Sequence, residues 1–391
     1  IQKALELAPH ATEKERALIN ALAKRYAKDP PEDRSSLDAA YADAMLKVAQ
    51  RFPDDVDIAT LYAESLLDLH PWDYWKKDGS AQPWTPEILT TLESVLERVP
   101  EHQGAIHFYI HATEASPEPQ RAEQYADRLS RLVQGTSHLA HMPSHTYIRI
   151  GRYHDATLAN QRALAMDQTY IAECHAQGIY PLAYMPHNSH FLWFSATMEG
   201  RYALAMQAAR DTAAQVDDSM MRDPMWGPLM QHFALLPLYT QVRFGKWDQI
   251  LQDTAPADAL PYPNGIWHYA RGMAFTEKGE LDSAAEELNK LKAIAADPAL
   301  QDQKVWAVNS IAAILDIASE VLSGELAARR TDYDAAIRHL KKAVRLEDAL
   351  TYIEPPDWYY PVRQSLGAVL LEAGRPEEAE RIYREDLRHN P

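Results

Sequence analysis

A short pattern, in which an alanine stands five residues after a glycine, recurs along the chain and constrains its fold more than any other feature. It occurs at Gly151–Ala156, Gly200–Ala205 and Gly279–Ala284. Apolar residues around these turns are spaced three and four apart, as in amphipathic helices, and no alternating strand pattern of useful length occurs. Such a glycine ends one helix in the left-handed conformation, and the small alanine lets the next helix approach closely. The sequence therefore predicts an all-α chain of helical hairpins.

The C-terminal copy of this pattern indicates the type of repeat. It contains, in order, Trp358, Tyr359, Tyr360, Gly367, Ala368, Leu371, Gly374, Ala379, Tyr383 and Pro391. This order resembles the tetratricopeptide repeat (TPR), a helix–turn–helix unit of about 34 residues. Gly245 and Gly279 are 34 residues apart, whereas other anchors are 43 to 52 residues apart, so the repeats are degenerate. The resemblance implies a right-handed, TPR-like α-solenoid over residues 1–391, with roughly nine to ten hairpins. Ile1–Pro9 has the pattern of a helix tail, so we expect the N-terminal repeat to be truncated.

One segment, Leu69–Thr85, lacks repeat character. Its sequence, LHPWDYWKKDGSAQPWT, is rich in proline, glycine and aspartate and holds three of the nine tryptophans. This composition predicts an irregular inserted loop. Because of its tryptophans, we expect the loop to pack over the solenoid as a lid or plug.

Histidines recur at equivalent positions of successive repeats. With Gly151 as position 15 of its repeat, His138, His141 and His145 take positions 2, 5 and 9 of the first helix. The resemblance to tetratricopeptide repeats implies that these positions face the concave groove. The same registration in the neighbouring repeats completes a predicted stripe of nine residues, namely His107, His111, Glu114, His138, His141, His145, His187, His190 and His232.

This stripe predicts a site for a divalent transition metal. Residues three and four apart share one helix face, with Cβ atoms about 5–6 Å apart, and imidazole is the commonest metal ligand. Two or three imidazoles, with or without a carboxylate, suit zinc, copper or iron, and the number of ligands allows two ions. The predicted ligands are His107, His111, Glu114, His138, His141, His145, His187 and His190. Two other interpretations remain open, a polar groove for an acidic peptide or small ligand and a purely structural network.

Two residues near the stripe, Pro143 and Cys174, each allow two interpretations. Pro143 lies between His141 and His145, where it either tilts the two ligands together or marks a turn. The single cysteine, Cys174, excludes an intrachain disulfide and a thiolate-rich zinc site. It is either a soft metal ligand or a small apolar core residue.

Charge and motifs exclude several function classes. A net charge of −17 disfavours nucleic acid and anionic membrane surfaces, and it favours metal ions or basic peptides. No apolar run approaches the ~20 residues that span a bilayer. The chain is compatible with the cytoplasm and with the periplasm. It contains no GxSxG, P-loop, GxGxxG or HExxH motif, so no standard catalytic machinery is indicated.

Three longer phrases carry a closer resemblance. IHFYIHATEAS (106–116), HLAHMPSHTYIRIGRYHDA (138–156) and YPLAYMPHNSHFLW (180–193) are similar to a group of bacterial TPR proteins of undefined function. The phrases coincide with the histidine stripe, and the resemblance implies the fold but no activity. The leading hypothesis is a metal-binding repeat protein, of which a metal-dependent hydrolase or oxidoreductase is one form. The alternative is a non-enzymatic scaffold that binds a peptide or protein in the groove.

Overall fold

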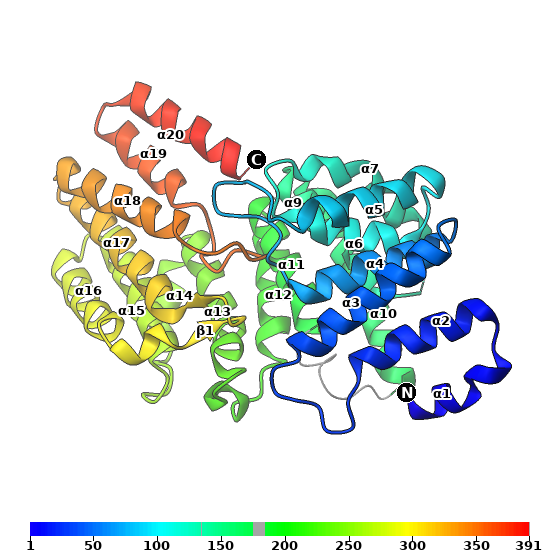
Figure 1. The fold of residues 1–391 in the computed structure, drawn as a ribbon. Helices are drawn as coiled ribbons and strands as arrows, with labels where there is room; N and C mark the ends of the chain where they lie inside the picture. The colour runs from blue at the N-terminus through cyan, green and yellow to red at the C-terminus, as the bar shows by residue number, and fades with distance from the viewer. Residues whose placement is uncertain (134, 175–183, 391) are drawn as a thin grey trace. The chain divides into compact units, whose positions relative to one another are not determined.

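The chain is an all-α protein of TPR-like helical hairpins, as the sequence predicts (Figure 1). The computed structural model describes residues 1–133, 135–174 and 184–390, with the backbone alone for 169–174. It divides into two compact units, Ile1–Arg149 and Ile150–Pro391. Among the helices of the described residues, none has a stretch long and apolar enough to cross a membrane.

The first unit holds the helices on which most of the predicted ligands lie. They are, in chain order, α1 (Gln2–Leu7), α2 (Glu13–Leu22), α3 (Ser35–Arg51), α4 (Val56–Leu69), α5 (Thr85–Arg98), α6 (Gln103–Glu114), α7 (Glu123–Leu132), α8 (Ser137–His141) and α9 (Pro143–Arg149). Tyr41 and Met45 of α3 pack with Ile58 and Tyr62 of α4 in the core of this unit. Helix α6 packs against α4, α5 and α9, and this packing fixes the helix that carries the first predicted ligands.

The loop between α4 and α5 is the tryptophan-rich segment. His70 stacks on Trp84 with ring centroids 3.6 Å apart, whereas Trp72 is exposed. The indole nitrogen of Trp75 donates a hydrogen bond to the backbone oxygen of Ala112 at 2.8 Å. Since Ala112 lies in the last turn of α6, this hydrogen bond anchors the loop on the helix that carries the candidate site.

The second unit continues the repeat with longer helices. They are α10 (Tyr153–Cys174), α11 (Met185–Met198), α12 (Tyr202–Ala213), α13 (Gly227–Arg243), α14 (Trp247–Gln252), α15 (Pro261–Lys278), α16 (Leu281–Ala295), α17 (Ile311–Arg329), α18 (Tyr333–Asp348), α19 (Val362–Glu372) and α20 (Pro376–His389). Helix α13 packs against α15, α15 against α17, and α17 against α19, so the first helices of successive hairpins are neighbours.

The turns within these hairpins confirm the glycine–alanine pattern. The residue that closes each turn has a positive φ at Gly200 (72°), Gly245 (64°), Gly279 (79°), Thr331 (61°) and Gly374 (69°). The alanine five residues later is fully buried at Ala205, Ala284, Ala336 and Ala379. A left-handed turn followed by a small residue at the helix contact is the arrangement that the sequence predicts.

Two insertions interrupt the hairpins of the second unit. The first is a β-hairpin of β1 (Lys304–Val305) and β2 (Asn309–Ser310) between α16 and α17. Its tip residues, Trp306 and Ala307, have φ values of 52° and 58°. The Trp306 ring centroid lies 5.8 Å from that of His187 and 6.1 Å from that of Phe233. The tip of this insertion therefore covers side chains of α11 and α13.

The second insertion comprises residues 351–361 and precedes α19. It contains Trp358, Tyr359 and Tyr360, which the sequence pattern assigns to the C-terminal repeat but which lie before its first helix. The ring centroid of Trp358 lies 5.4 Å from that of Tyr269 on α15 and 6.3 Å from that of Tyr239 on α13. The three aromatic residues are buried because this segment fills a surface of the preceding repeats.

Candidate metal centre

Five histidines and one carboxylate gather in the first unit. Helix α6 carries His107, His111 and Glu114 at i, i+4 and i+7, so all three lie along one helix face. The short helices α8 and α9 supply the other three members of this cluster, which are His138, His141 and His145. The structure thus brings together six of the nine residues of the predicted stripe.

The sequence at Pro143 determines how α8 and α9 present their histidines. Helix α8 ends at His141, Met142 keeps a right-handed helical conformation, and α9 begins at Pro143. Proline is well tolerated at the first position of a helix, where its missing N–H has no helical partner. Across this junction the Nε2 atoms of His141 and His145 are 2.9 Å apart. Pro143 therefore marks a helix start, and the two imidazoles face each other across it.

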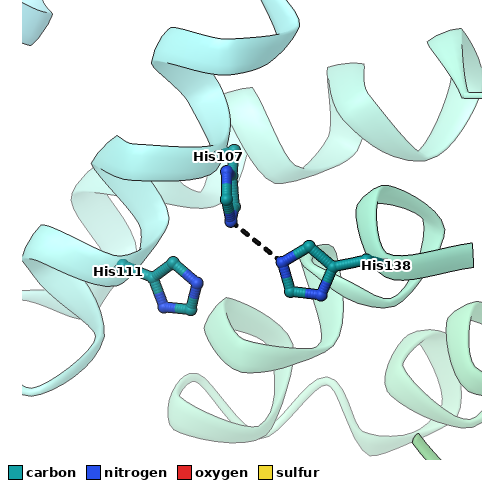
Figure 2. Close-up of side chains that lie close together, drawn as sticks. All are labelled: His107, His111 and His138. Carbon is teal, nitrogen blue, oxygen red and sulfur yellow. Dashed lines mark hydrogen bonds between the residues drawn. The ribbon is translucent and has the colours of Figure 1, made fainter. Parts of the chain in front are cut away.

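His107, His111 and His138 form the first group of potential ligands (Figure 2). The Nε2 atoms of His107 and His138 are 3.0 Å apart. One ligand nitrogen from each of the three rings lies within 4.8 Å of the other two. Figure 2 shows the ring of His111 turned so that one of its nitrogens faces the other two rings. Three imidazoles from α6 and α8 thus converge on one point.

Glu114 forms a second group with His111 and His145. Its carboxylate oxygens lie 3.3 Å from Nδ1 of His111 and 2.9 Å from Nδ1 of His145. Glu114 is only 4% exposed, so this carboxylate faces the two rings rather than solvent. His111 belongs to both groups, and it links them into one cluster.

Burial and charge give the members of the cluster different protonation states. Burial, followed by the neighbouring histidines, holds the pKa of His107 well below its ordinary value and lowers that of His138 to about 4. Burial alone would raise the pKa of Glu114. Charge interactions and hydrogen bonds with the neighbouring rings of His145 and His111 instead lower it to about 2. Near neutral pH, the two imidazoles are therefore neutral and the carboxyl is ionised, which are the forms that bind metals.

The remaining histidines of the predicted stripe lie in the second unit. His187 and His190 are on α11, and His232 is on α13. The rings of His190 and His232 are 5.4 Å apart, and Nδ1 of His232 lies 2.9 Å from the hydroxyl of Tyr262. Both rings are buried, and burial lowers their pKa values, that of His232 to about 4. Within the described part of this unit, no group of three potential ligands forms around either ring.

Two other residues complete the account of the site. The Ser144 hydroxyl lies 3.2 Å from Nδ1 of His141, a contact that the sequence analysis missed. The three-residue spacing from His141 was the only signal available for it, because serine is common in loops and at helix starts. The side chain of Cys174, the alternative soft ligand, lies outside the residues whose side chains the structure describes.

Comparisons with known proteins show similarity in fold alone. No family model matches the chain, and no curated protein matches it. Similar solved structures include the APC/C hetero-tetramer Cut9–Hcn1, with 14% identity and a TM-score of 0.37 over 99% of this chain and 63% of that one. Yeast Tom70 has 12% identity and a TM-score of 0.36 over 96% and 66%. The human IFIT1 dimer with m7Gppp-AAAA has 13% identity and a TM-score of 0.36 over 90% and 77%. The chain spans less than two thirds of the first two, and none of these similarities bears on its activity or partners.

Proposed function

We propose that the protein is a helical-repeat protein that holds a divalent transition metal ion, zinc, copper or iron, between His107, His111 and His138. The observation that carries the proposal is the convergence of one nitrogen from each of these rings within 4.8 Å. The three imidazoles are partly buried and face each other through their nitrogens. A cation is the natural partner for several converging lone pairs.

The distances between the ring nitrogens are close to those expected around a bound ion. Two nitrogens that each lie about 2.0–2.1 Å from a tetrahedral ion are roughly 3.3 Å apart. The Nε2 atoms of His107 and His138 are already 3.0 Å apart. One nitrogen of His111 lies within 4.8 Å of both, so the three rings need to approach one another only slightly to share one ion. The lowered pKa values of His107 and His138 mean that protons compete weakly for these two ligands near neutral pH.

Three protein ligands would leave a coordination position for water or a substrate. This is the pattern of catalytic zinc sites, whereas structural zinc sites usually have four protein ligands. A metal-dependent hydrolase or oxidoreductase is therefore a form that this function could take, with the ion as Lewis acid or redox centre.

Metal analysis of the full chain tests the proposal. The purified protein is stripped with a chelator, reconstituted separately with Zn²⁺, Cu²⁺ or Fe²⁺, desalted and measured by elemental mass spectrometry. We expect at least one of these ions to be retained at about one per chain, and we expect His107→Ala and His138→Ala to lose it.

A histidine outside the cluster provides the matched control. His154 lies on the exposed surface of α10, where its Nδ1 is 2.8 Å from Glu199. His154→Ala should retain the ion at the wild-type level. A wild-type protein that retains no ion after reconstitution would contradict the proposal, and so would an equal loss in His154→Ala.

A non-enzymatic scaffold for a peptide or protein is the second candidate. The repeat fold favours it at least as directly as it favours metal binding, because stacked hairpins create extended binding surfaces without any metal. In this case, a pull-down with the full chain should recover the same dominant partner with and without a chelator. His138→Ala would then leave partner binding intact.

A further inference from the structure

We propose that Glu114 is a positioning residue that fixes the tautomers of His111 and His145, and that it is not a metal ligand. This inference rests on the metal-binding function proposed above and assigns a specific role to one member of the site. An ionised carboxylate can only accept hydrogen bonds, so a ring nitrogen that bonds to it must carry a proton. In a neutral ring, the lone pair is then on the other nitrogen.

The geometry around Glu114 meets this condition on both sides. The carboxylate lies 3.3 Å from Nδ1 of His111 and 2.9 Å from Nδ1 of His145. Both nearest atoms are Nδ1, although the two rings come from different helices, α6 and α9. Glu114 is 4% exposed and ends α6, so the carboxylate is held between the two rings. We therefore assign the Nδ1–H tautomer to both His111 and His145.

This assignment directs the Nε2 lone pair of His111 toward the proposed ion. Nδ1 of His111 faces Glu114, and the nitrogen on the other side of the ring faces His107 and His138 (Figure 2). All three rings of the site then use Nε2. Metal-binding histidines usually donate their second N–H to a carboxylate or carbonyl, which fixes the ring and increases its basicity. Glu114 supplies that acceptor for His111.

The same assignment fixes which atom donates and which accepts in the hydrogen bonds of His141 and His145. If Nδ1 of His145 carries the proton, its Nε2 accepts from Nε2–H of His141, which is 2.9 Å away. Nδ1 of His141 then accepts from the Ser144 hydroxyl at 3.2 Å. This direction leaves every donor in the series with an acceptor and needs no ion. The His141–His145 pair therefore belongs to the support of the site, and the ion is placed at His107, His111 and His138.

Glu114→Gln separates this role from that of a ligand. The amide replaces one of the two accepting oxygens with a donating NH2 group. Because both carboxylate oxygens lie 3.3 Å from Nδ1 of His111, the NH2 group faces this nitrogen in either orientation of the amide and disfavours the Nδ1–H tautomer of His111. We expect a 10–100-fold weaker Zn²⁺ affinity, as is usual when a residue that orients a ligand is changed. Glu114→Asp keeps two accepting oxygens and should recover part of the loss.

The experiment has two readouts. In metal-free protein labelled with ¹⁵N at histidine, NMR reports the tautomer of each ring, with His111→Gln and His145→Gln used for assignment. In the second readout, competition with a chromophoric chelator measures Zn²⁺ affinity. We expect Nδ1–H for both rings in the wild type and a change in at least one of them in Glu114→Gln. Glu199→Gln, which alters the Glu199–His154 pair of the second unit, is the matched control and should leave both readouts unchanged.

Several results would overturn the assignment. One is an Nε2–H tautomer of His111 or His145 in the metal-free wild type. Another is an unchanged Zn²⁺ affinity in Glu114→Gln, and a third is a loss as complete as that of His138→Ala, which would make Glu114 a ligand. If the wild type binds no ion, the proposed function fails, while the NMR readout still decides the role of Glu114. Circular dichroism checks that Glu114→Gln is folded. If it is not, the tautomers of the wild type and the Zn²⁺ affinity of Glu114→Asp decide the question.

Discussion

At the scale of single residues, buried polar groups outside the candidate site also have measurable consequences. Asp357, in the 351–361 insertion, is 2% exposed and accepts a hydrogen bond from Nδ2 of Asn309 at 2.8 Å. Burial raises its pKa to about 7, although the hydrogen bond from Asn309 acts in the opposite direction. An unfolded aspartate has a pKa near 3.9. The folded protein therefore holds an extra proton on this carboxyl between about pH 4 and pH 7.

Replacing Asp357 with asparagine should flatten part of the dependence of stability on pH. Because the folded pKa is raised, the stability that this group contributes is fully present below about pH 4 and is lost as the pH rises through about 7. The slope is at most about 1.4 kcal/mol per pH unit for one proton. We expect the free energy of unfolding of Asp357→Asn, relative to the wild type, to increase from pH 4.5 to pH 8. Urea unfolding at several pH values measures it, and a constant difference would contradict this account.

Residue types and spacing predicted much of the candidate site, but not the role of each residue. The seven-residue span from His107 to Glu114 placed three side chains on one helix face, and the structure brings this face to the histidines of α8 and α9. Spacing within a helix does not reveal which ring nitrogen faces a carboxylate, because this depends on the contact between α6 and α9. The sequence therefore predicted Glu114 only as a ligand, while the contacts of its carboxylate support a different proposal.

At the scale of helical hairpins, one turn departs from the rest. Thr331 has a φ of 61° at a position where the equivalent turns carry glycine. A residue with a Cβ in this region costs about 1–2 kcal/mol, and threonine is exposed here. We expect Thr331→Gly to stabilise the protein by a few tenths to about 1 kcal/mol, since the relief of strain exceeds the entropy that glycine adds to the unfolded chain. Thermal unfolding measures the change.

The reverse substitution at an equivalent turn provides the control. Gly279 has a φ of 79°, and a Cβ added there would meet nothing within 4 Å. Gly279→Ala should therefore destabilise the protein by about 1 kcal/mol through the backbone alone. If both substitutions change stability in the same direction, the account of the turn is wrong.

The hairpins themselves could be predicted because their signals are local. A glycine turn, a small residue five positions later and a helical apolar period all lie within one repeat, as at Gly200 and Ala205. The insertions gave no such signal. The burial of Trp358 depends on Tyr239 and Tyr269, which lie about 90 to 120 residues earlier in the chain. Nothing in the local pattern of residues 351–361 indicates that contact.

At the scale of the whole molecule, the division into two units predicts which part of the chain a bound metal ion stabilises. The proposed ligands His107, His111 and His138 all lie in Ile1–Arg149. Zn²⁺ at 100 times its dissociation constant should stabilise the unit that binds it by about 2.7 kcal/mol. We expect roughly 100-fold slower hydrogen exchange for amides of α6, α8 and α9 that exchange through unfolding of the first unit.

Mass spectrometry of hydrogen exchange, with and without Zn²⁺, checks this expectation. Peptides from α15 to α20 serve as the internal reference and should exchange at the same rate in both conditions. His138→Ala should remove the effect in the first unit. Protection that spreads equally over both units would contradict a site confined to the first.

A single asparagine ties the two insertions of the second unit together. Nδ2 of Asn309, in the β-hairpin, donates to the backbone oxygen of Thr351 and to Asp357, and Oδ1 of Asn309 accepts from the backbone N–H of Thr351. Loss of either insertion would leave buried polar groups of the other without partners. In homologous chains, we therefore expect these two segments to appear and disappear together. The joint presence of the two segments would then distinguish one group of homologous chains from those that lack both.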